Sequence, residues 1–245
     1  MQDHQFTPEP IQADPVDHLL SKIAQRKDGF EAARVKLLGA ALKLVPFEGW
    51  TPLMIQKAAQ DADLATDQIE VLFPDRVADL LDFWHGDADE AMLSKMSGDE
   101  FSSLKIRQKI TQALIFRLDY LAPHKEATRR AAATLALPHM APKGVKLTWR
   151  SADRIWQALG DSSLDFNYYS KRTILAGVWG STLTKWLGDE SENHQATLDF
   201  LDQRIANVMQ FEKWKADWKK RDIDIARTFK EGVIPALAKL RYPGR

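Results

Sequence analysis

The side chains of this 245-residue chain that could perform chemistry are scattered along it. None of its six histidines stands four residues from another: they are His4, His18, His85, His124, His139 and His194. No Glu-x-x-His pair is present for a helical di-iron site. The sequence also lacks the glycine-rich phosphate-binding patterns and the Gly-x-Ser-x-Gly elbow of hydrolases. These observations favour a protein that is not an enzyme, with no catalytic residue, no metal site and no cofactor.

The amino-acid composition further limits the kinds of protein that this chain can be. Apolar residues make up 44% of the chain and charged residues 28%, which is typical of a globular protein. The formal net charge is zero, so the chain as a whole has no attraction for nucleic acid. The absence of cysteine excludes disulfides and thiolate metal sites and fits a reducing compartment. Residues 1–14 are acidic and proline-rich, unlike a signal or transit peptide, and no apolar run reaches about 18 residues. We therefore expect a flexible tail at residues 1–14 and a cytoplasmic protein.

Apolar residues recur at spacings of three and four along most of the sequence, which predicts an all-α fold. Proline and glycine divide the pattern into about ten helices, capped by Thr51, Thr66 and Asp75 at three of the starts. We expect one helical domain over residues 15–210 and a separate last helix within residues 211–245. The predicted helices cover residues 15–27, 31–47, 52–61, 67–73, 76–96, 101–121, 125–137, 143–159, 165–187, 193–210 and 211–234, with Gly29 separating the first two.

Residues 31–83 resemble the helix-turn-helix head of TetR-type regulators. In that family the third helix enters the major groove of DNA. Here the segment from Pro52 to Asp75 carries one lysine against five anions, a net charge of −4. DNA affinity comes largely from cations that neutralise phosphates, and the predicted third helix begins with Asp67, Gln68 and Glu70. The head is therefore interpreted as a packing element that does not bind nucleic acid, with DNA binding as the alternative.

The stretch "SSLDFNYYSKRTILAGVWGS", residues 162–181, combines crowded aromatics with small residues. Its second half is apolar around most of a helix, which indicates a buried position. Ala176, Gly177, Gly180 and Ser181 would let another helix or a ligand chain approach closely. Its first half places polar groups beside Tyr168 and Tyr169, the residue types of protein interfaces. Two tyrosines simply packed at a helix start, with solvated hydroxyls, are the alternative.

The run "GDSSLDFNYYSKRTILAGVW" (160–179) closely resembles the signature of the coenzyme Q biosynthesis accessory family, the ninth Coq protein. The likeness covers about residues 31–210 and includes "LVPFEGWT" (44–51), "LPHMAP" (137–142), "RIWQALGD" (154–161) and "FLDQRIANVM" (200–209). It implies a TetR-like fold without DNA binding, an apolar cavity for isoprenoid lipid, and binding to the di-iron demethoxyubiquinone hydroxylase. Tyr168 stands where relatives often have Trp.

The resemblance also implies site residues. A partner surface is expected at Asp165, Asn167, Tyr168, Tyr169 and Arg172. Apolarity and helical facing supply candidates for the lipid cavity, most of which would equally suit an ordinary core: Ile106, Ile110, Leu114, Ile155, Leu159, Val178 and Leu183. The expected ligand is an isoprenoid lipid or a quinone precursor.

Residues 211–245 carry ten cations against five anions, a net charge of +5. An aromatic stripe flanked by lysines is typical of a helix that lies at a membrane surface. The predicted membrane contacts are Phe211, Trp214, Lys215, Trp218, Lys219, Lys220, Arg221, Ile225 and Phe229. Packing of this helix on its own domain or on a second subunit, as in a homodimer, is the alternative.

Together these features predict a non-catalytic accessory protein of ubiquinone biosynthesis. It would bind an isoprenoid quinone precursor at the inner face of a membrane as a peripheral protein and present it to the hydroxylase. The alternative is a TetR-type transcriptional regulator with a lipid-like effector.

Overall fold

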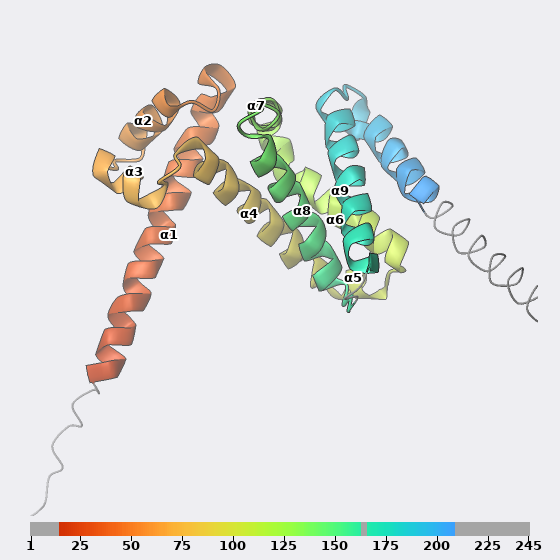
Figure 1. Ribbon diagram of the computed structural model, residues 1–245, viewed down its shortest axis with the longest axis horizontal. Helices are drawn as coiled ribbons and strands as arrows, with labels where there is room; N and C mark the ends of the chain where they lie inside the picture. Colours follow the sequence, from red (N-terminus) through yellow and green to blue (C-terminus); the bar gives the residue numbers. More distant parts are fainter. Residues whose placement is uncertain (1–14, 163–165, 209–245) are drawn as a thin grey trace, which may run out of the picture. The chain divides into compact units, whose positions relative to one another are not determined.

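The computed structural model describes residues 15–162 and 166–208, with side chains for residues 28–162 and 167–208. Within these ranges every regular element is a helix, which confirms the predicted all-α fold. The α-helices are α1 (Pro15–Glu48), α2 (Pro52–Asp61), α3 (Thr66–Leu72), α4 (Val77–Met96), α5 (Asp99–Ser103), α6 (Ile106–Leu121), α7 (Lys125–Leu135), α8 (Ala141–Ala158) and α9 (Phe166–Leu187) (Figure 1). Two 3-10 turns, η1 (Ala122–His124) and η2 (Glu192–His194), and a helix over residues 195–208 complete the described chain.

These elements form two compact units. The described residues up to Asp87, with His124–Gly144, make up the head unit; Ala88–Pro123 and the described residues from Val145 onward make up the body unit. The helix-turn-helix segment predicted at residues 31–83 falls wholly inside the head unit. Each unit has its own buried core, and the two are described separately below.

The head unit is built around α1. Its buried face, with Leu37, Ala41 and Val45, packs against α2 and α7. Trp50 stacks on Trp84, with ring centroids 5.3 Å apart, and donates its indole N–H to the Ala127 carbonyl over 3.0 Å. This hydrogen bond satisfies the polar atom of a nearly buried ring, as burial of a tryptophan requires. The residues after α1 and the start of α7 are thereby held together.

The start of α2 follows the prediction. Thr51 is the N-cap, and its hydroxyl accepts a hydrogen bond from the Met54 N–H over 3.1 Å. Pro52 occupies the first helical position, where its missing N–H costs nothing. Gly49, with φ +70°, ends α1 in the left-handed conformation that glycine adopts without strain.

Four predicted helix boundaries are wrong, near residues 29, 66, 75 and 104. Gly29 does not separate two helices but lies inside α1, because a single glycine costs a long helix only about 1 kcal/mol. Residues 101–121 do not form one helix: the backbone is extended at Leu104 and Lys105, between α5 and α6. Thr66 is the first residue of α3 rather than its cap, and the Ala65 N–H donates to the Gln68 side chain over 2.9 Å.

Asp75 does not cap α4 through its side chain either. The helix begins at Val77, after Arg76 in the left-handed conformation (φ 46°). The carboxylate of Asp79, one turn further on, accepts the Asp75 N–H over 2.8 Å. The prediction that Asp75 caps this helix is therefore wrong, and the carboxylate at the helix start belongs to Asp79.

The body unit packs α5, α6, α8, α9 and the helix over residues 195–208 around an apolar core. An ion pair between Asp89 and Arg117 is completely buried in it. The Arg117 guanidinium lies 5.0 Å from the Trp179 ring centre, and Arg150 approaches the other oxygen of Asp89 within 3.5 Å. A buried charge is tolerated only when it is paired, so this cluster ties α4, α6, α8 and α9 to one geometry.

Candidate binding pocket and aromatic surface

Helix α9 presents two distinct faces along its first four turns. Successive residues are rotated by about 100°, so Asn167, Lys171, Ile174 and Val178 share one face. Tyr168 and Tyr169 point away from it. The first face lines a pocket, and the second forms an exposed aromatic cluster.

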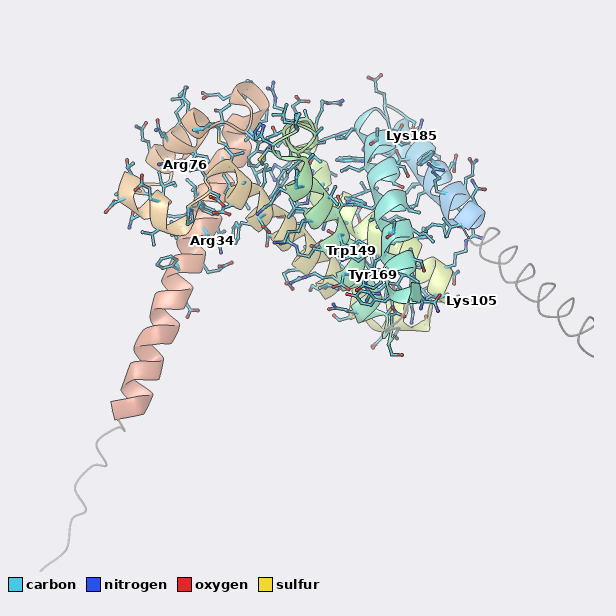
Figure 2. All side chains as sticks on the ribbon, in the orientation of Figure 1. Arg34, Arg76, Lys105, Trp149, Tyr169 and Lys185 are labelled. Atoms are coloured by element: carbon cyan, nitrogen blue, oxygen red, sulfur yellow. The ribbon has the colours of Figure 1, made fainter. Side chains whose placement is uncertain are left out.

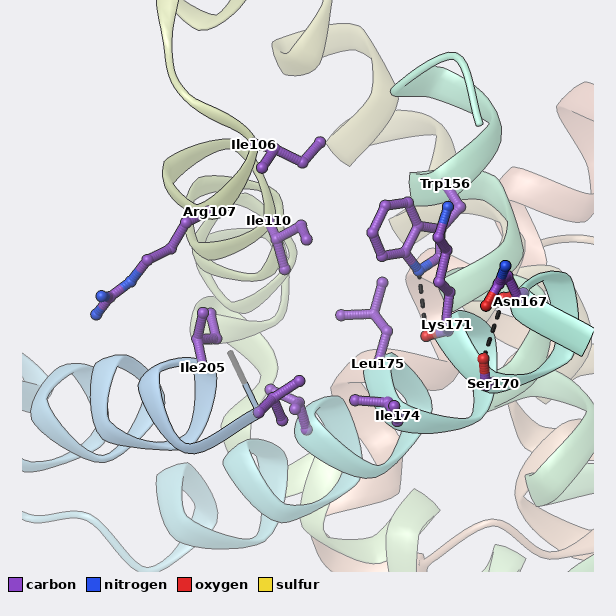
Figure 3. Close-up of a pocket in the computed structure, with 12 residues that line it drawn as sticks. Ile106, Arg107, Ile110, Trp156, Asn167, Ser170, Lys171, Ile174, Leu175 and Ile205 are labelled. Atoms are coloured by element: carbon purple, nitrogen blue, oxygen red, sulfur yellow. Dashed lines mark hydrogen bonds between the residues drawn. The ribbon is translucent and has the colours of Figure 1, made fainter. Parts of the chain in front are cut away.

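The pocket has a volume of about 340 Å³ and is enclosed by four elements (Figure 3). Helix α6, Trp156 of α8, α9 and the helix over residues 195–208 provide its walls. We call it the α9 pocket. Its lining residues are Ile106, Arg107, Ile110, Trp156, Asn167, Ser170, Lys171, Ile174, Leu175, Val178, Ile205 and Val208.

The two sides of the α9 pocket differ in polarity. Isoleucines of α6, α9 and the helix over residues 195–208 form an apolar side, while Asn167, Ser170 and Lys171 stand near Trp156 (Figure 3). The Trp156 indole N–H donates to the Lys171 carbonyl over 3.2 Å, and the Lys171 ammonium lies 5.2 Å from the Trp156 ring centre. Arg107 points away from the cavity and binds Asp202 over 2.7 Å. The pocket therefore suits an apolar molecule with a polar end.

The sequence identified part of this lining. Of the seven predicted lipid-contacting residues, Ile106, Ile110 and Val178 line the α9 pocket. Leu114 and Ile155 are buried in the core, and Leu159 and Leu183 are half-buried but do not line the pocket. Trp156, Ile174, Leu175, Ile205 and Val208 were missed, because facing on a single helix does not reveal which faces of separate helices meet. The short runs 154–161 and 200–209 that carry the resemblance contain Trp156, Ile205 and Val208, and could have pointed to them.

Gly177 and Gly180 do not serve as close-contact positions. A Cβ atom at either one would meet no atom of the described residues within 4 Å, and Gly177 is exposed. Among the described residues, no neighbouring helix therefore approaches α9 closely at these two glycines. The buried stripe of this half is instead formed by Leu175, Val178 and Trp179.

The aromatic surface is defined by Trp149 of α8 and by Tyr168 and Tyr169 at the start of α9; Trp149 and Tyr169 are labelled in Figure 2. The Tyr168 and Tyr169 rings meet edge to face with centroids 5.1 Å apart, and Tyr169 lies 6.4 Å from the Trp149 ring. Tyr169 is 61% exposed, which is unusual for a large aromatic residue. Trp149 is an addition to the surface that the sequence did not indicate.

Arg172 does not face solvent as its place in the predicted partner surface requires. Its side chain is 1% exposed, and its guanidinium donates to Asp153 over 2.5 Å and to Asp161 over 3.0 Å. Burial by itself would lower the pKa of Arg172, but the hydrogen bonds to the two carboxylates outweigh it and raise the pKa. Arg172 is therefore a buried residue that supports the aromatic surface, and not an exposed member of it.

The other predicted partner residues have different outcomes. Asn167 is exposed but also lines the α9 pocket. Asp165 lies outside the described residues, as do all nine predicted membrane contacts between residues 211 and 229. Their roles stay predictions.

No group of three histidine, aspartate or glutamate side chains in the described ranges is arranged to hold a metal ion. Burial lowers the pKa of His124 below its ordinary value. No helix among the described residues is long and apolar enough to span a bilayer.

The exposed face of α3 is acidic. Asp67, Gln68 and Glu70 are all exposed, and Glu70 binds Arg76 over 2.9 Å. The side chains that would face DNA in a helix-turn-helix protein thus include no cation at the start of α3.

Comparison with known proteins shows which residues of the chain are similar to a known family. Residues 141–212, which contain α8, α9 and the residues that follow, match the family model named COQ9. The chain is 29% identical over 219 residues to rat "Ubiquinone biosynthesis protein COQ9, mitochondrial", covering 85% of this chain and 70% of the rat protein. It is 30% identical over 187 residues to the bovine protein of the same name, covering 73% of this chain and 58% of that protein. The Drosophila melanogaster protein is 28% identical over 210 residues, covering 84% of this chain and 64% of its own length.

Among solved structures, the fold is similar to that of the TetR transcriptional regulator from Nitrosomonas europaea, with a TM-score of 0.60. The two are 23% identical, and the match covers 72% of this chain and 98% of the regulator. This likeness shows the fold alone. The expected resemblance to the coenzyme Q accessory family and the expected TetR-like fold are both confirmed.

Proposed function

We propose that this chain, which resembles COQ9 proteins along most of its length, is a non-catalytic accessory protein of ubiquinone biosynthesis. It binds the isoprenoid chain of a quinone precursor in the α9 pocket and presents the precursor to demethoxyubiquinone hydroxylase. The observation that carries the proposal is the position of an apolar pocket and an exposed aromatic surface on two faces of one helix, α9. The aromatic surface and the pocket walls from α8, α9 and Ile205 lie inside residues 141–212, which match the family model; the pocket wall from α6 lies outside them.

The pocket supports the lipid part of the proposal. Its volume of about 340 Å³ lies within the range of small-molecule sites, and its walls are mostly branched aliphatic side chains. Each methylene group moved from water into such walls contributes about 0.8 kcal/mol. Burial of even part of an isoprenoid chain would therefore give useful affinity without specific polar contacts.

The aromatic surface supports the partner part. Exposed aromatic residues are enriched where proteins dock, because they bury a large area with few rotatable bonds. Tyr169 presents such area beside the half-buried Trp149, while the buried Arg172 holds Tyr168 in place. These are features of binding, so we assign the chemistry to the hydroxylase.

The basic segment at residues 211–245 would hold the protein on the inner face of the membrane as a peripheral protein. Its net charge of +5 and its tryptophans suit an anionic lipid surface. This placement would bring the pocket to the bilayer, where a long isoprenoid chain otherwise keeps its ring away from an active site in solution.

Lipid analysis tests the proposal directly. The full chain is purified from cells that make ubiquinone, extracted with organic solvent and analysed by mass spectrometry. Co-purified isoprenoid quinones or their precursors are expected. A protein that carries no isoprenoid and shifts promoter DNA in a gel would instead establish a regulator, which the acidic face of α3 argues against.

Docking is tested with Tyr168→Ala combined with Tyr169→Ala. The double variant is expected to lose capture of the hydroxylase while keeping its helical circular dichroism. Unchanged capture would refute the assignment of the aromatic surface.

A further inference from the structure

A single carboxylate, Asp161, contacts both functional faces of α9. It lies in the connection between α8 and α9, and its side chain is 5% exposed. One oxygen accepts from the ammonium of Lys171 over 2.6 Å, and the other accepts from the guanidinium of Arg172 over 3.0 Å. Lys171 lines the α9 pocket, and Arg172 supports the aromatic surface. Asp161 therefore joins two cations that serve different sites.

On the pocket side, Lys171 is tied to a wall of the cavity. The Trp156 ring forms that wall, its N–H binds the Lys171 carbonyl, and the Lys171 ammonium lies beside the ring (Figure 3). A ligand that enters the pocket must press against Trp156 and the Lys171 side chain. Filling of the pocket thus acts on Asp161 through Lys171.

On the surface side, Arg172 is tied to the exposed rings. Its guanidinium carbon lies 3.5 Å from the centre of the Tyr168 ring, and the Tyr168 ring meets Tyr169 edge to face. A small displacement of Arg172 therefore reaches the exposed Tyr169 through two direct contacts.

The charges make the inner part of this route, from Asp161 to Arg172, rigid, whereas the Lys171 side chain is 37% exposed. Arg172 is buried and Asp161 nearly so, and separating a buried ion pair is costly because the freed charges regain no water. Packed interiors respond to such strain by shifting together rather than by opening gaps. When Lys171 moves, Asp161 and Arg172 are expected to move with it.

We infer that Asp161 is a positioning residue that couples filling of the α9 pocket to the geometry of the aromatic surface, so that the lipid-loaded protein binds its partner more tightly than the empty one. This inference rests on the proposed function. Coupling between binding sites is reciprocal, so the partner raises the affinity for the lipid by the same factor.

The test measures the coupling factor, which is the ratio of the affinities for the hydroxylase with and without saturating short-chain ubiquinone. Titration calorimetry on the full chain gives both affinities, and quenching of tryptophan fluorescence reports pocket filling. In the wild type the factor is expected to be at least about fivefold. In Lys171→Met, which removes the ammonium but leaves Asp161 bound to Arg172, the factor is expected to fall to about one. Lys171→Arg, which keeps a cation for Asp161, is expected to restore most of it.

Lys185→Met is the matched control, because Lys185 is exposed near the end of the same helix and does not line the α9 pocket. It is expected to keep the wild-type factor. Asp161→Asn is expected to behave like Lys171→Met, and if this variant does not fold, Lys171→Met decides the question alone.

Failure of the proposed function and failure of the coupling inference give different results. A wild type that binds neither ubiquinone nor the hydroxylase contradicts the proposed function itself. A wild type that binds both, but with a coupling factor of one, leaves the proposed function standing and overturns the inference. A factor that persists in both Lys171→Met and Asp161→Asn also overturns it, because the coupling then takes another route.

Discussion

Tyr168 and Arg172 share one carboxylate oxygen. The Arg172 Nε and the Tyr168 hydroxyl both donate to Oδ1 of Asp153, over 2.5 Å and 3.3 Å. The guanidinium also lies on the Tyr168 ring, with its carbon 3.5 Å from the ring centre. Because the two residues are four apart on α9, one helical turn brings both to the same aspartate of α8. A buried cation thereby fixes the orientation of an aromatic residue at the surface.

Removal of that cation should unfold the body unit more easily. Arg172→Met leaves the carboxylates of Asp153 and Asp161 without their shared partner, one of them nearly buried. Breaking a pair of this kind by removing one member is expected to lower the free energy of unfolding by about 3 kcal/mol. Urea denaturation measures this change in the free energy of unfolding. Arg204→Met, at an exposed position, should change stability by less than about 0.5 kcal/mol. A loss below about 1 kcal/mol in Arg172→Met would show that the pair contributes little.

Tyr169 should matter for docking and not for folding. Its side chain is mostly exposed, so Tyr169→Ala should leave the free energy of unfolding within about 0.5 kcal/mol of the wild type. Loss of a central aromatic contact typically costs an interface about 2 kcal/mol, so the dissociation constant for the hydroxylase should rise more than tenfold. Tyr169→Phe keeps the ring and should keep most of the affinity. Equal affinity of the alanine variant and the wild type would place the docking surface elsewhere.

A larger side chain in the wall of the α9 pocket should prevent the ligand from binding there. Ile174 lines the pocket and is only half-buried, so Ile174→Phe can place a ring in the cavity without displacing the core. Quenching of tryptophan fluorescence by short-chain ubiquinone should then require at least about tenfold more ligand, since a ring takes the volume that the isoprenoid would occupy. Leu183→Phe adds the same group to the same helix outside the pocket and serves as the control. Similar quenching in both variants would separate lipid binding from this cavity.

The basic segment can be tested by its charges. Replacement of Lys215, Lys219 and Lys220 by alanine removes three cations from residues 211–245. Each contributes about 1 kcal/mol near an anionic leaflet, so partition onto vesicles that contain phosphatidylserine should fall about a hundredfold. Sedimentation with such vesicles measures the partition. On neutral vesicles the wild type and the variant should differ little. An unchanged partition would favour a helix packed on its own domain or on a second subunit.

Acid should destabilise the helix over residues 195–208 through Asp189. Hydrogen bonds from Ser191 and Thr197 lower the pKa of the Asp189 carboxyl below its ordinary value of 3.8. Because the folded-state pKa is the lower one, the contribution of Asp189 is complete above about pH 4 and is lost as the pH falls further. Urea unfolding of the wild type and of Asp189→Asn should therefore differ most at neutral pH and converge in acid. A difference that stays constant down to pH 2 would contradict this role.

Local signals in the sequence account for much of the fold. Thr51 followed by Pro52 predicts the start of α2 because a cap needs only its own turn. Gly29 misled the prediction because a glycine penalty of about 1 kcal/mol is easily outweighed within a long helix. The break between α5 and α6 was missed because the apolar periodicity continues through Leu104. Interactions within a single helical turn, such as capping, can be predicted from sequence. A small local penalty, such as that of one glycine, cannot be used to place a helix end, because the rest of the helix can outweigh it.

The sequence by itself determined the helical class, the acidic face of α3 and the two-faced character of α9, since each depends on residue type and spacing along one helix. Only the tertiary structure decided that Arg172 is buried, that Trp149 joins the aromatic surface and that Ile205 completes the pocket. The partners of these residues lie on other elements, such as Asp153 on α8 and Ile106 on α6. Periodicity states which way a side chain points on its own helix. Whether water, a carboxylate or another ring lies there depends on how the helices pack, because that packing decides which charges are paired and which aromatic rings stay exposed.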